Sequence, residues 1–423
     1  MIKSIAGLTL NCLIVIALLT SCSSPTITDE DTVSTDETPQ TEEETISEEQ
    51  EIEENQVTEE TTEEKEQTKP PEEEAATEED EETEEVTEPE EELTIPPSMP
   101  RGTEDPSIAI DVYKIDKAYN GTTLLADNHD HLIPRIIEVN MLGEVVWEYI
   151  LPDDMKKHTN PGFDVELLAN DNVLFVLPGK GVYEINREGD IVWSYLTSKI
   201  SHDADRLPDG NTIFVYGNSD QKSDPQVTEV NEEGQVVWTW YARDDFDEPP
   251  YSTISNEGWT HTNSVTRMDN GNTLISPRNF CRLIEVDSGG EVVRTIGDGV
   301  IFASPDLRLN ASGNADPFSP HDPEILPNGN ILMVSQYFPM RAIEMVPDTG
   351  EVVWEYALPE RMNYPVRDAD RLPNGNILIT GAIKITEVTP GGEVVWQLSM
   401  QGVTWGKGEG QGLGYYKAER IGL

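Results

Sequence analysis

From residue 108 onward, short apolar runs alternate with polar turn residues in a pattern that repeats six times. Each repeat holds an Asn-, Asp- or Gly-rich turn that leads into an apolar run, as in the PNGNILM of residues 327–333. A Gly-Glu-Val-Val-Trp phrase follows, as at residues 350–354. Short runs of β-branched and aromatic residues between such turns predict strands and hairpins rather than helices. The pattern therefore predicts an all-β domain.

Each repeat offers four such runs, with a Trp in the last, which is typical of one blade of a β-propeller. A single blade cannot bury both of its faces, so neighbouring blades must cover one another. We predict a six-bladed β-propeller of four-stranded blades over residues 105–423. The tail YYKAERI, residues 415–421, resembles a first strand such as DADRL and is expected to close the ring against the N-terminal blade. An open β-sandwich is the alternative, but its strands would not repeat in register.

Residues 1–21 have the pattern of an export signal. Lys3 precedes an apolar run that is too short and too early for a convincing membrane span. The run ends in Leu-Thr-Ser-Cys22, similar to the lipobox of bacterial lipoproteins, in which the cysteine is acylated after cleavage. We expect an exported cell-envelope protein that meets the membrane only through a lipid on Cys22. A simple secretory signal with a chance cysteine is the alternative.

Residues 22–104 are predicted to be a disordered acidic tether. Between residues 23 and 100 there are 32 Asp and Glu against two Lys, with many Thr and Pro. Such a segment cannot bury enough apolar area to offset its ordering entropy. The remaining domain is also acidic, so binding to nucleic acid is not expected.

Cysteine usage adds one constraint. Cys12 leaves with the signal and Cys22 carries the lipid, so Cys281 has no partner for a disulfide in the mature chain. The core alone must stabilise the domain, and its length makes that possible.

Candidate chemistry gathers at one position of the repeat, eight residues before the turn glycine. In the four-strand interpretation this position begins the innermost strand, beside the central channel. From the first to the sixth repeat it holds Tyr113, Phe163, His202, Asn263, His321 and Arg367. This one position of the repeat therefore varies from blade to blade, and its polar residues are expected to form a cluster.

Two further residues are expected to join this cluster. His261 lies two residues before Asn263, so strand alternation would point both side chains the same way. Arg278 follows the second strand of the same blade and could reach over the channel mouth. Imidazole, amide and guanidinium donors in an acidic protein predict a site for an oxyanion, with no cofactor or metal. The alternative is that these histidines are packing residues.

Other conspicuous residues are given structural roles. The aspartates that follow the channel position should tie strands or blades together, and the repeated tryptophans should pack between blades. His129 and His131 form a weak metal-binding spacing in an Asp-rich loop, and His158 is expected in solvent. The residues concerned are Asp203, Asp322, Asp368, Trp147, Trp193, Trp238, Trp354 and Trp396.

Four phrases resemble the aryl-sulfate sulfotransferase (arylsulfotransferase) family, across residues 108–423. They are SHDADRLPDGNTIF, GWTHTNSVTRMDNGNTLISPRNF, SPHDPEILPNGNIL and GYYKAERI. The resemblance implies a six-bladed propeller in the bacterial envelope. It also implies transfer of a sulfuryl group from an aryl sulfate donor to a phenolic acceptor through a sulfohistidine, without a nucleotide donor.

Carried over by motif, the resemblance makes His321 the nucleophile. His202, His261, Asn263 and Arg278 would hold the sulfuryl oxygens and assist the phenolic oxygens. The chain departs from the enterobacterial members because it can form no disulfide and has an acidic tether in place of an N-terminal β domain. It also has Arg294 where other repeats have Trp.

Two other functions remain open at this point. One is a non-catalytic envelope lipoprotein whose propeller face binds a protein partner or a small anion. The other is a quinone-dependent dehydrogenase, suggested by the DTGEVVWEY around Trp354. Six repeats rather than eight and the lack of a vicinal cysteine pair argue against the dehydrogenase.

Overall fold

The computed structural model describes residues 98–255, 257–297, 300–304, 307–310, 319–336, 340–358, 365–403 and 414–423. The predicted signal peptide, Cys22 and nearly all of the predicted tether lie outside the described residues. Within the described part of the chain, no helix is long and apolar enough to cross a membrane.

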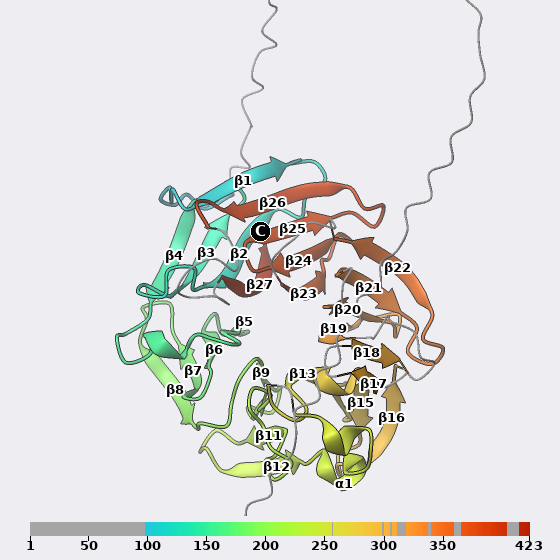
Figure 1. Ribbon diagram of the computed structural model, residues 1–423. Coiled ribbons are helices and arrows are strands. Elements are labelled where there is room, and N and C mark those ends of the chain that lie inside the picture. Colours follow the sequence, from blue (N-terminus) through green and yellow to red (C-terminus); the bar gives the residue numbers. More distant parts are fainter. Residues whose placement is uncertain are drawn as a thin grey trace, which may run out of the picture. The chain divides into compact units, whose positions relative to one another are not determined.

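Antiparallel four-stranded blades are arranged in a ring, as Figure 1 shows, which confirms the predicted six-bladed all-β propeller. Blade one pairs β27 (Tyr415–Gly422), β2 (Gly121–Asp127), β3 (Arg135–Asn140) and β4 (Val145–Ile150). Blade two comprises β5 (Val165–Leu167), β6 (Val173–Leu177), β7 (Gly181–Ile185) and β8 (Ile191–Leu196). Blade three comprises β9 (Ala204–Arg206), β10 (Thr212–Val215), β11 (Val227–Val230) and β12 (Val236–Trp240).

The other three blades follow the same order from the channel outward. Blade four comprises β13 (Thr262–Arg267), β14 (Thr273–Pro277), β15 (Leu283–Val286) and β16 (Val292–Ile296). Blade five comprises β19 (Pro320–Ile325), β20 (Ile331–Ser335), β21 (Arg341–Met345) and β22 (Val352–Ala357). Blade six comprises β23 (Val366–Arg371), β24 (Ile377–Gly381), β25 (Lys384–Val388), β26 (Val394–Met400) and, at its outer edge, β1 (Ile108–Tyr113).

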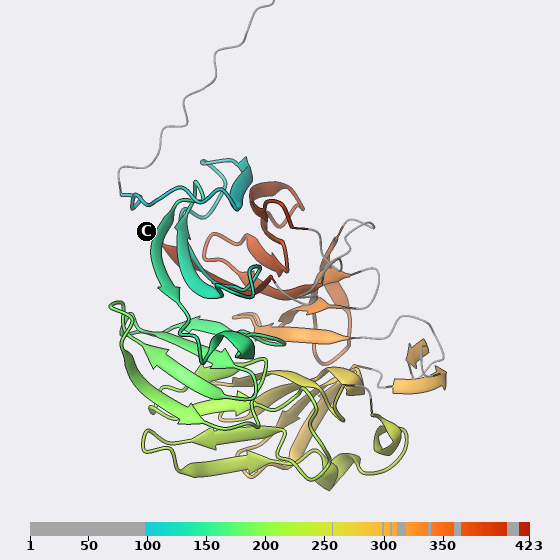
Figure 2. The same ribbon diagram turned by 60° about the vertical axis from the view of Figure 1, so that its left-hand side comes forward.

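A few short elements lie outside the blades. Figure 2 shows the hairpin of β17 (Val300–Ser304) and β18 (Leu307–Asn310) standing apart from blades four and five. The helical turns are η1 (Lys156–His158), α1 (Arg243–Phe246), η2 (Tyr251–Thr253) and η3 (Arg278–Phe280).

The two ends of the propeller close the ring in different places. As predicted, the C-terminal β27 pairs with β2 and becomes the innermost strand of blade one. The first strand of the domain, β1, instead pairs with β26 on the outside of blade six. The expectation for Tyr113 was therefore wrong, because this residue lies opposite Trp396 at the outer edge of a blade. Tyr416 of β27 takes the channel position that the sequence assigned to Tyr113.

The hydrophobic core lies between neighbouring blades. Side chains alternate along a strand, so adjacent residues face opposite neighbours. In blade one, Leu124 packs against blade two and Leu125 against blade six. In blade two, Phe175 packs against blade one and Leu174 against blade three. Both faces of the second strand are thus covered, which explains the continuous apolar runs after each turn.

The repeated tryptophans join blades as expected, but mostly at half-buried positions. Trp147 Nε1 donates to the Arg187 carbonyl of the next blade, and Trp354 Nε1 to the Pro390 carbonyl. Trp396 alone among the five is fully buried, because β1 adds a strand beside it. An arginine side chain lies over each of these five rings.

Candidate active site

The structure brings the predicted site residues together at one end of the channel. His202 lies two residues before β9, Asn263 lies in β13, His321 in β19 and Arg367 in β23. These four strands are the innermost strands of their blades (Figure 1). His261 reaches the same place from the loop that precedes β13. The three imidazoles are 3–4% exposed, so the cluster is a buried one.

His202 and His261 form a direct imidazole pair. Their Nε2 atoms lie 3.1 Å apart and their ring centroids 4.8 Å apart. His261 Nδ1 lies 2.7 Å from the Glu257 carbonyl, which can only accept, so this nitrogen carries the proton. His261 Nε2 is then an acceptor, and His202 Nε2 donates to it.

Ser201 fixes the same tautomers from the other end of the pair. Its Oγ accepts hydrogen bonds from the backbone N–H groups of Gly217 and Asn218, at 3.2 and 3.1 Å. The hydroxyl proton is therefore directed to His202 Nδ1, which lies 2.7 Å away. Both ends assign the proton of His202 to Nε2, so the chain of hydrogen bonds runs in one direction.

The backbone of His261 is held by a buried carboxylate that the sequence did not single out. Asp220 accepts hydrogen bonds from the backbone N–H groups of Thr260 and His261 and from the Thr260 hydroxyl, at 2.9 to 3.2 Å. His261 has a φ of 47°, in the left-handed region. Strand alternation was thus the wrong reason for its direction, because Asp220 and this turn set it.

His321 contacts a residue from the far end of the chain. Tyr416 Oη lies 3.3 Å from His321 Nε2. The Arg367 guanidinium lies over the Tyr416 ring, 5.2 Å from its centroid, and donates from Nη1 to the Tyr415 carbonyl. Tyr416 was not predicted as a site residue, although the YKAER that it begins has the spacing of the RDADR that follows Val366.

Asn263 and Arg278 occupy different parts of the site. Asn263 Nδ2 donates to the Pro320 carbonyl at 2.9 Å, which ties blade four to the residue before His321. One N–H of this amide is thus engaged in positioning. Arg278 Nη2 lies 3.1 Å from His261 Nδ1 and 3.2 Å from the Glu257 carboxylate, at the partly exposed rim.

Burial and the two guanidinium groups keep the imidazoles neutral. Burial lowers the pKa of His202 to about 3, and Arg278 and Arg367 act in the same direction. Burial also holds the pKa values of His261 and His321 well below their usual range, again with help from nearby cations. The Arg367 pKa falls to about 10 through burial, so its charge remains at neutral pH. The cluster therefore combines neutral nitrogen bases with fixed positive charge.

A layer of carboxylates lies directly behind this cluster. Lys417 Nζ lies 3.6 to 3.9 Å from Asp164, Asp203 and Asp322. Asp203 Oδ2 also accepts from the Val265 backbone N–H of the next blade at 2.7 Å, the tying role expected for it. Acidic side chains further along the inner strands repeat this contact, as Glu324 does with the Arg371 N–H.

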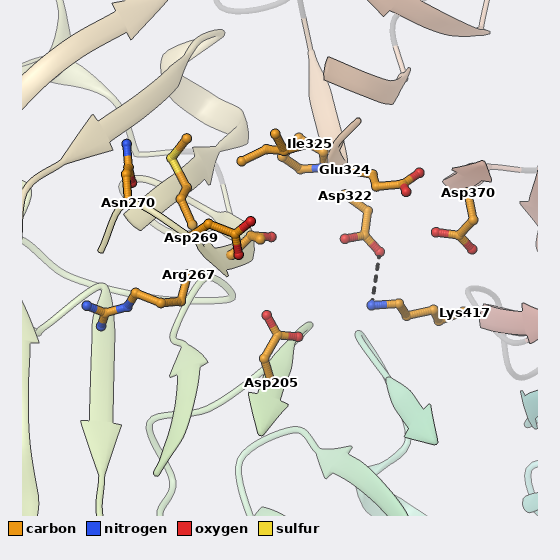
Figure 3. A pocket seen from close by; sticks show the side chains of 12 residues that line it. Asp205, Arg267, Asp269, Asn270, Asp322, Glu324, Ile325, Asp370 and Lys417 are labelled. Atoms are coloured by element: carbon orange, nitrogen blue, oxygen red, sulfur yellow. Dashed lines mark ion pairs between the residues drawn. The ribbon is translucent and has the colours of Figure 1, made fainter. Parts of the chain in front are cut away.

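Beyond Lys417 the channel opens into an acidic pocket of about 560 Å³ (Figure 3). Asp205, Asp322, Glu324 and Asp370 line it together with Lys417. In the described residues, no group of three or more His, Cys, Asp or Glu is arranged to hold a metal ion. Carboxylates would repel an anion here, so the imidazole end of the channel is the candidate anion site.

The remaining histidines lie away from the cluster. His129 Nδ1 contacts the Asp127 carboxylate, and His131 is exposed in the same loop. His158, expected in solvent, is half-buried and lies 3.2 Å from the Pro178 carbonyl.

The fold and the site define a six-bladed propeller with a buried, neutral imidazole cluster beside two guanidinium groups. The model of the family described as Arylsulfotransferase (ASST) matches residues 112–319, which confirms the resemblance seen in the sequence. The match includes His202, His261, Asn263 and Arg278 and ends two residues before His321. It supports an arylsulfotransferase-like function.

The similar solved structures have low sequence identity to this chain. A protein of unknown function from Bacteroides caccae is 18% identical, with a TM-score of 0.46 over 66% of this chain and 94% of that one. A streptogramin B lyase is 12% identical, with a TM-score of 0.43 over 70% and 88%. The virginiamycin B lyase of Staphylococcus aureus is 13% identical, with a TM-score of 0.42 over 70% and 90%. No curated protein sequence matches the chain. At these TM-scores the structural likeness carries no argument about function.

Proposed function

We propose that this protein transfers a sulfuryl group from an aryl sulfate to a phenolic acceptor through a sulfohistidine at His321, without a nucleotide donor. The observation that carries the proposal is the placement of three neutral imidazoles around one buried point, beside Arg278 and Arg367. A neutral imidazole nitrogen is a competent nucleophile, and fixed donors can meet the growing negative charge.

In the first step His321 Nε2 attacks sulfur, the N–S bond forms and the aryl S–O bond breaks. The electron pair leaves on the phenolate oxygen. The Arg278 guanidinium is a donor for the oxygens that gain charge, and His202 Nε2–H becomes a second donor once it turns from His261 Nε2 to the bound ester. Loss of one such donor typically lowers turnover about a hundredfold.

In the second step an acceptor phenol attacks sulfur and His321 becomes neutral imidazole again. The phenol must lose its proton as the new O–S bond forms. His261 Nε2 is the acceptor of the imidazole pair, so it is the group that can receive this proton. Its Nδ1–H bond to Glu257 then holds the resulting imidazolium in place.

The proposal is tested with purified residues 98–423, 4-nitrophenyl sulfate and a phenol acceptor. We expect release of 4-nitrophenol that depends on the acceptor, and its loss in His321→Ala. His131→Ala, a substitution of an exposed histidine, is the matched control and should retain activity. Mass spectrometry after donor alone should show one added SO₃ on the wild type, lost on mild acid treatment, and none on His321→Ala. Anion binding without transfer over a range of acceptors would favour the non-catalytic binding protein instead.

We also propose that the chain is exported and anchored by a lipid on Cys22. The support is the sequence pattern of residues 1–22 alone. Expression of the full chain in a bacterium that processes lipoproteins should give a palmitate-labelled product in the detergent phase. Cys22→Ala should remove both the label and the partitioning, and a soluble unlabelled wild-type product would contradict the anchor.

A further inference from the structure

Tyr416 is placed in the imidazole cluster by the closure of the ring. It lies in β27, which completes blade one from the C-terminal end of the chain. Its position in that strand corresponds to that of Arg367 in β23, so it completes the ring of channel positions. The side chain is 6% exposed.

The Tyr416 hydroxyl lies beside the proposed nucleophile. Oη is 3.3 Å from His321 Nε2, and the ring centroid is 5.8 Å from that of His321 and 5.9 Å from that of His202. Burial raises the pKa of this phenol well above its usual value, so the oxygen keeps its proton. A protonated hydroxyl against the lone pair of a neutral imidazole is a hydrogen-bond donor.

This contact has a consequence for the reaction. The ester must bring sulfur to the face of Nε2 that Tyr416 now occupies. The hydroxyl must then give up its contact with nitrogen, and the aryl oxygen on the far side of sulfur becomes its nearest acceptor. Because Oη is fixed to the ring, the ring must shift as sulfur enters, and the Arg367 guanidinium above it keeps the side chain beside the ester.

We propose that Tyr416 is a catalytic residue that donates a hydrogen bond to the phenolic oxygen as the S–O bond breaks, and that caps His321 Nε2 when no ester is bound. This inference rests on the proposed function. The Nε2–S bond forms, the S–O bond breaks and the electron pair goes to the phenolic oxygen. The tyrosine proton stays on Oη and strengthens its bond to that oxygen as charge develops.

The experiment compares Tyr416→Phe with wild type over a series of 4-substituted phenyl sulfates, at a fixed acceptor concentration. A donor to the leaving oxygen matters most when the leaving phenolate is basic. We expect kcat/KM to fall about tenfold for 4-nitrophenyl sulfate and about a hundredfold for unsubstituted phenyl sulfate. The plot of log kcat/KM against leaving-group pKa should therefore be steeper for the variant.

Tyr415→Phe is the matched control because it makes the same change one residue earlier in the same strand. The Tyr415 ring is fully buried, and among the described residues its hydroxyl has no hydrogen-bond partner. The plot of log kcat/KM against leaving-group pKa should have the same slope for Tyr415→Phe as for wild type. If wild type is active and Tyr416→Phe gives a plot of the same slope, the role of Tyr416 is overturned and the proposed function stands. A wild type that cleaves none of the esters would overturn both.

Discussion

The Arg294 guanidinium donates two hydrogen bonds to the buried Glu285 carboxylate, at 2.9 Å from Nε and 2.6 Å from Nη2. In four other blades the equivalent glutamate forms an ion pair with an arginine from the inner strand of the next blade. These pairs are Arg206–Glu184, Arg267–Glu229, Arg371–Glu344 and Arg420–Glu387. Blade five has Ile325 at that inner position, so Arg294 supplies from the outer strand the cation that blade five lacks. Blade four therefore has arginine in place of the repeated tryptophan because this arginine pairs with Glu285.

Arg294→Trp should destabilise the protein even though it restores the repeat phrase. Glu285 would keep its bond from Asn272 but lose its cation. A buried carboxylate left without its partner costs about 3 kcal/mol. The expected result is a lower midpoint of denaturant unfolding. The double variant with Ile325→Arg should recover much of the loss, and equal stability of the single variant and wild type would contradict this account.

The sequence allowed prediction of the blades and of four channel residues because both follow from the repeat. A turn glycine and an apolar run fix the strand register, and a constant offset then places His202, Asn263, His321 and Arg367 together. The closing strand was also recognisable, since YKAER has the spacing of an inner strand.

The sequence could not show which residue the closing strand would displace. Tyr113 has the right offset, but β1 pairs with blade six, and that choice depends on contacts between the two ends of the domain. Asp220 was missed for a related reason. It lies 40 residues before the Thr260 N–H that it binds, in a loop with no repeated pattern.

Asp220→Asn should impair the site through His261. The carboxylate binds two successive backbone N–H groups and also accepts from Gln226 Nε2 at 3.0 Å. An amide would put a donor against one of these groups, at a cost of about 2 kcal/mol. We expect lower stability and a kcat reduced about tenfold or more, measured with 4-nitrophenyl sulfate. Asp224→Asn, in the same loop but bonded to Lys199 and Gln221, should leave kcat unchanged.

Ser201→Ala should alter the reaction by releasing the tautomer of His202. Without the hydroxyl proton, Nδ1 of His202 loses its donor and the imidazole can turn its N–H away from His261. One neutral hydrogen bond of about 1.4 kcal/mol corresponds to a tenfold fall in kcat/KM. Ser201→Thr keeps the hydroxyl and should restore most of the activity. If alanine and threonine behave alike, the hydroxyl does not set the tautomer.

The acidic pocket behind Lys417 should make the fold less stable as pH rises. Burial raises the pKa of Asp370 to about 8, whereas an unfolded chain titrates this carboxyl near 3.8. Between these values the folded protein holds a proton that the unfolded chain has lost, so the free energy of unfolding falls as pH increases.

The histidines act in the opposite direction, because their lowered pKa values make acidification below about 6.5 destabilising. Only a variant can separate the two effects. Asp370→Asn should flatten the pH dependence between pH 5 and 8 by up to about 1.4 kcal/mol per pH unit. Denaturant midpoints at constant ionic strength measure this difference. Asp269→Asn, an exposed position at the rim of the same pocket, should keep the wild-type slope. Parallel curves for wild type and Asp370→Asn would show that Asp370 is ionised in the folded protein.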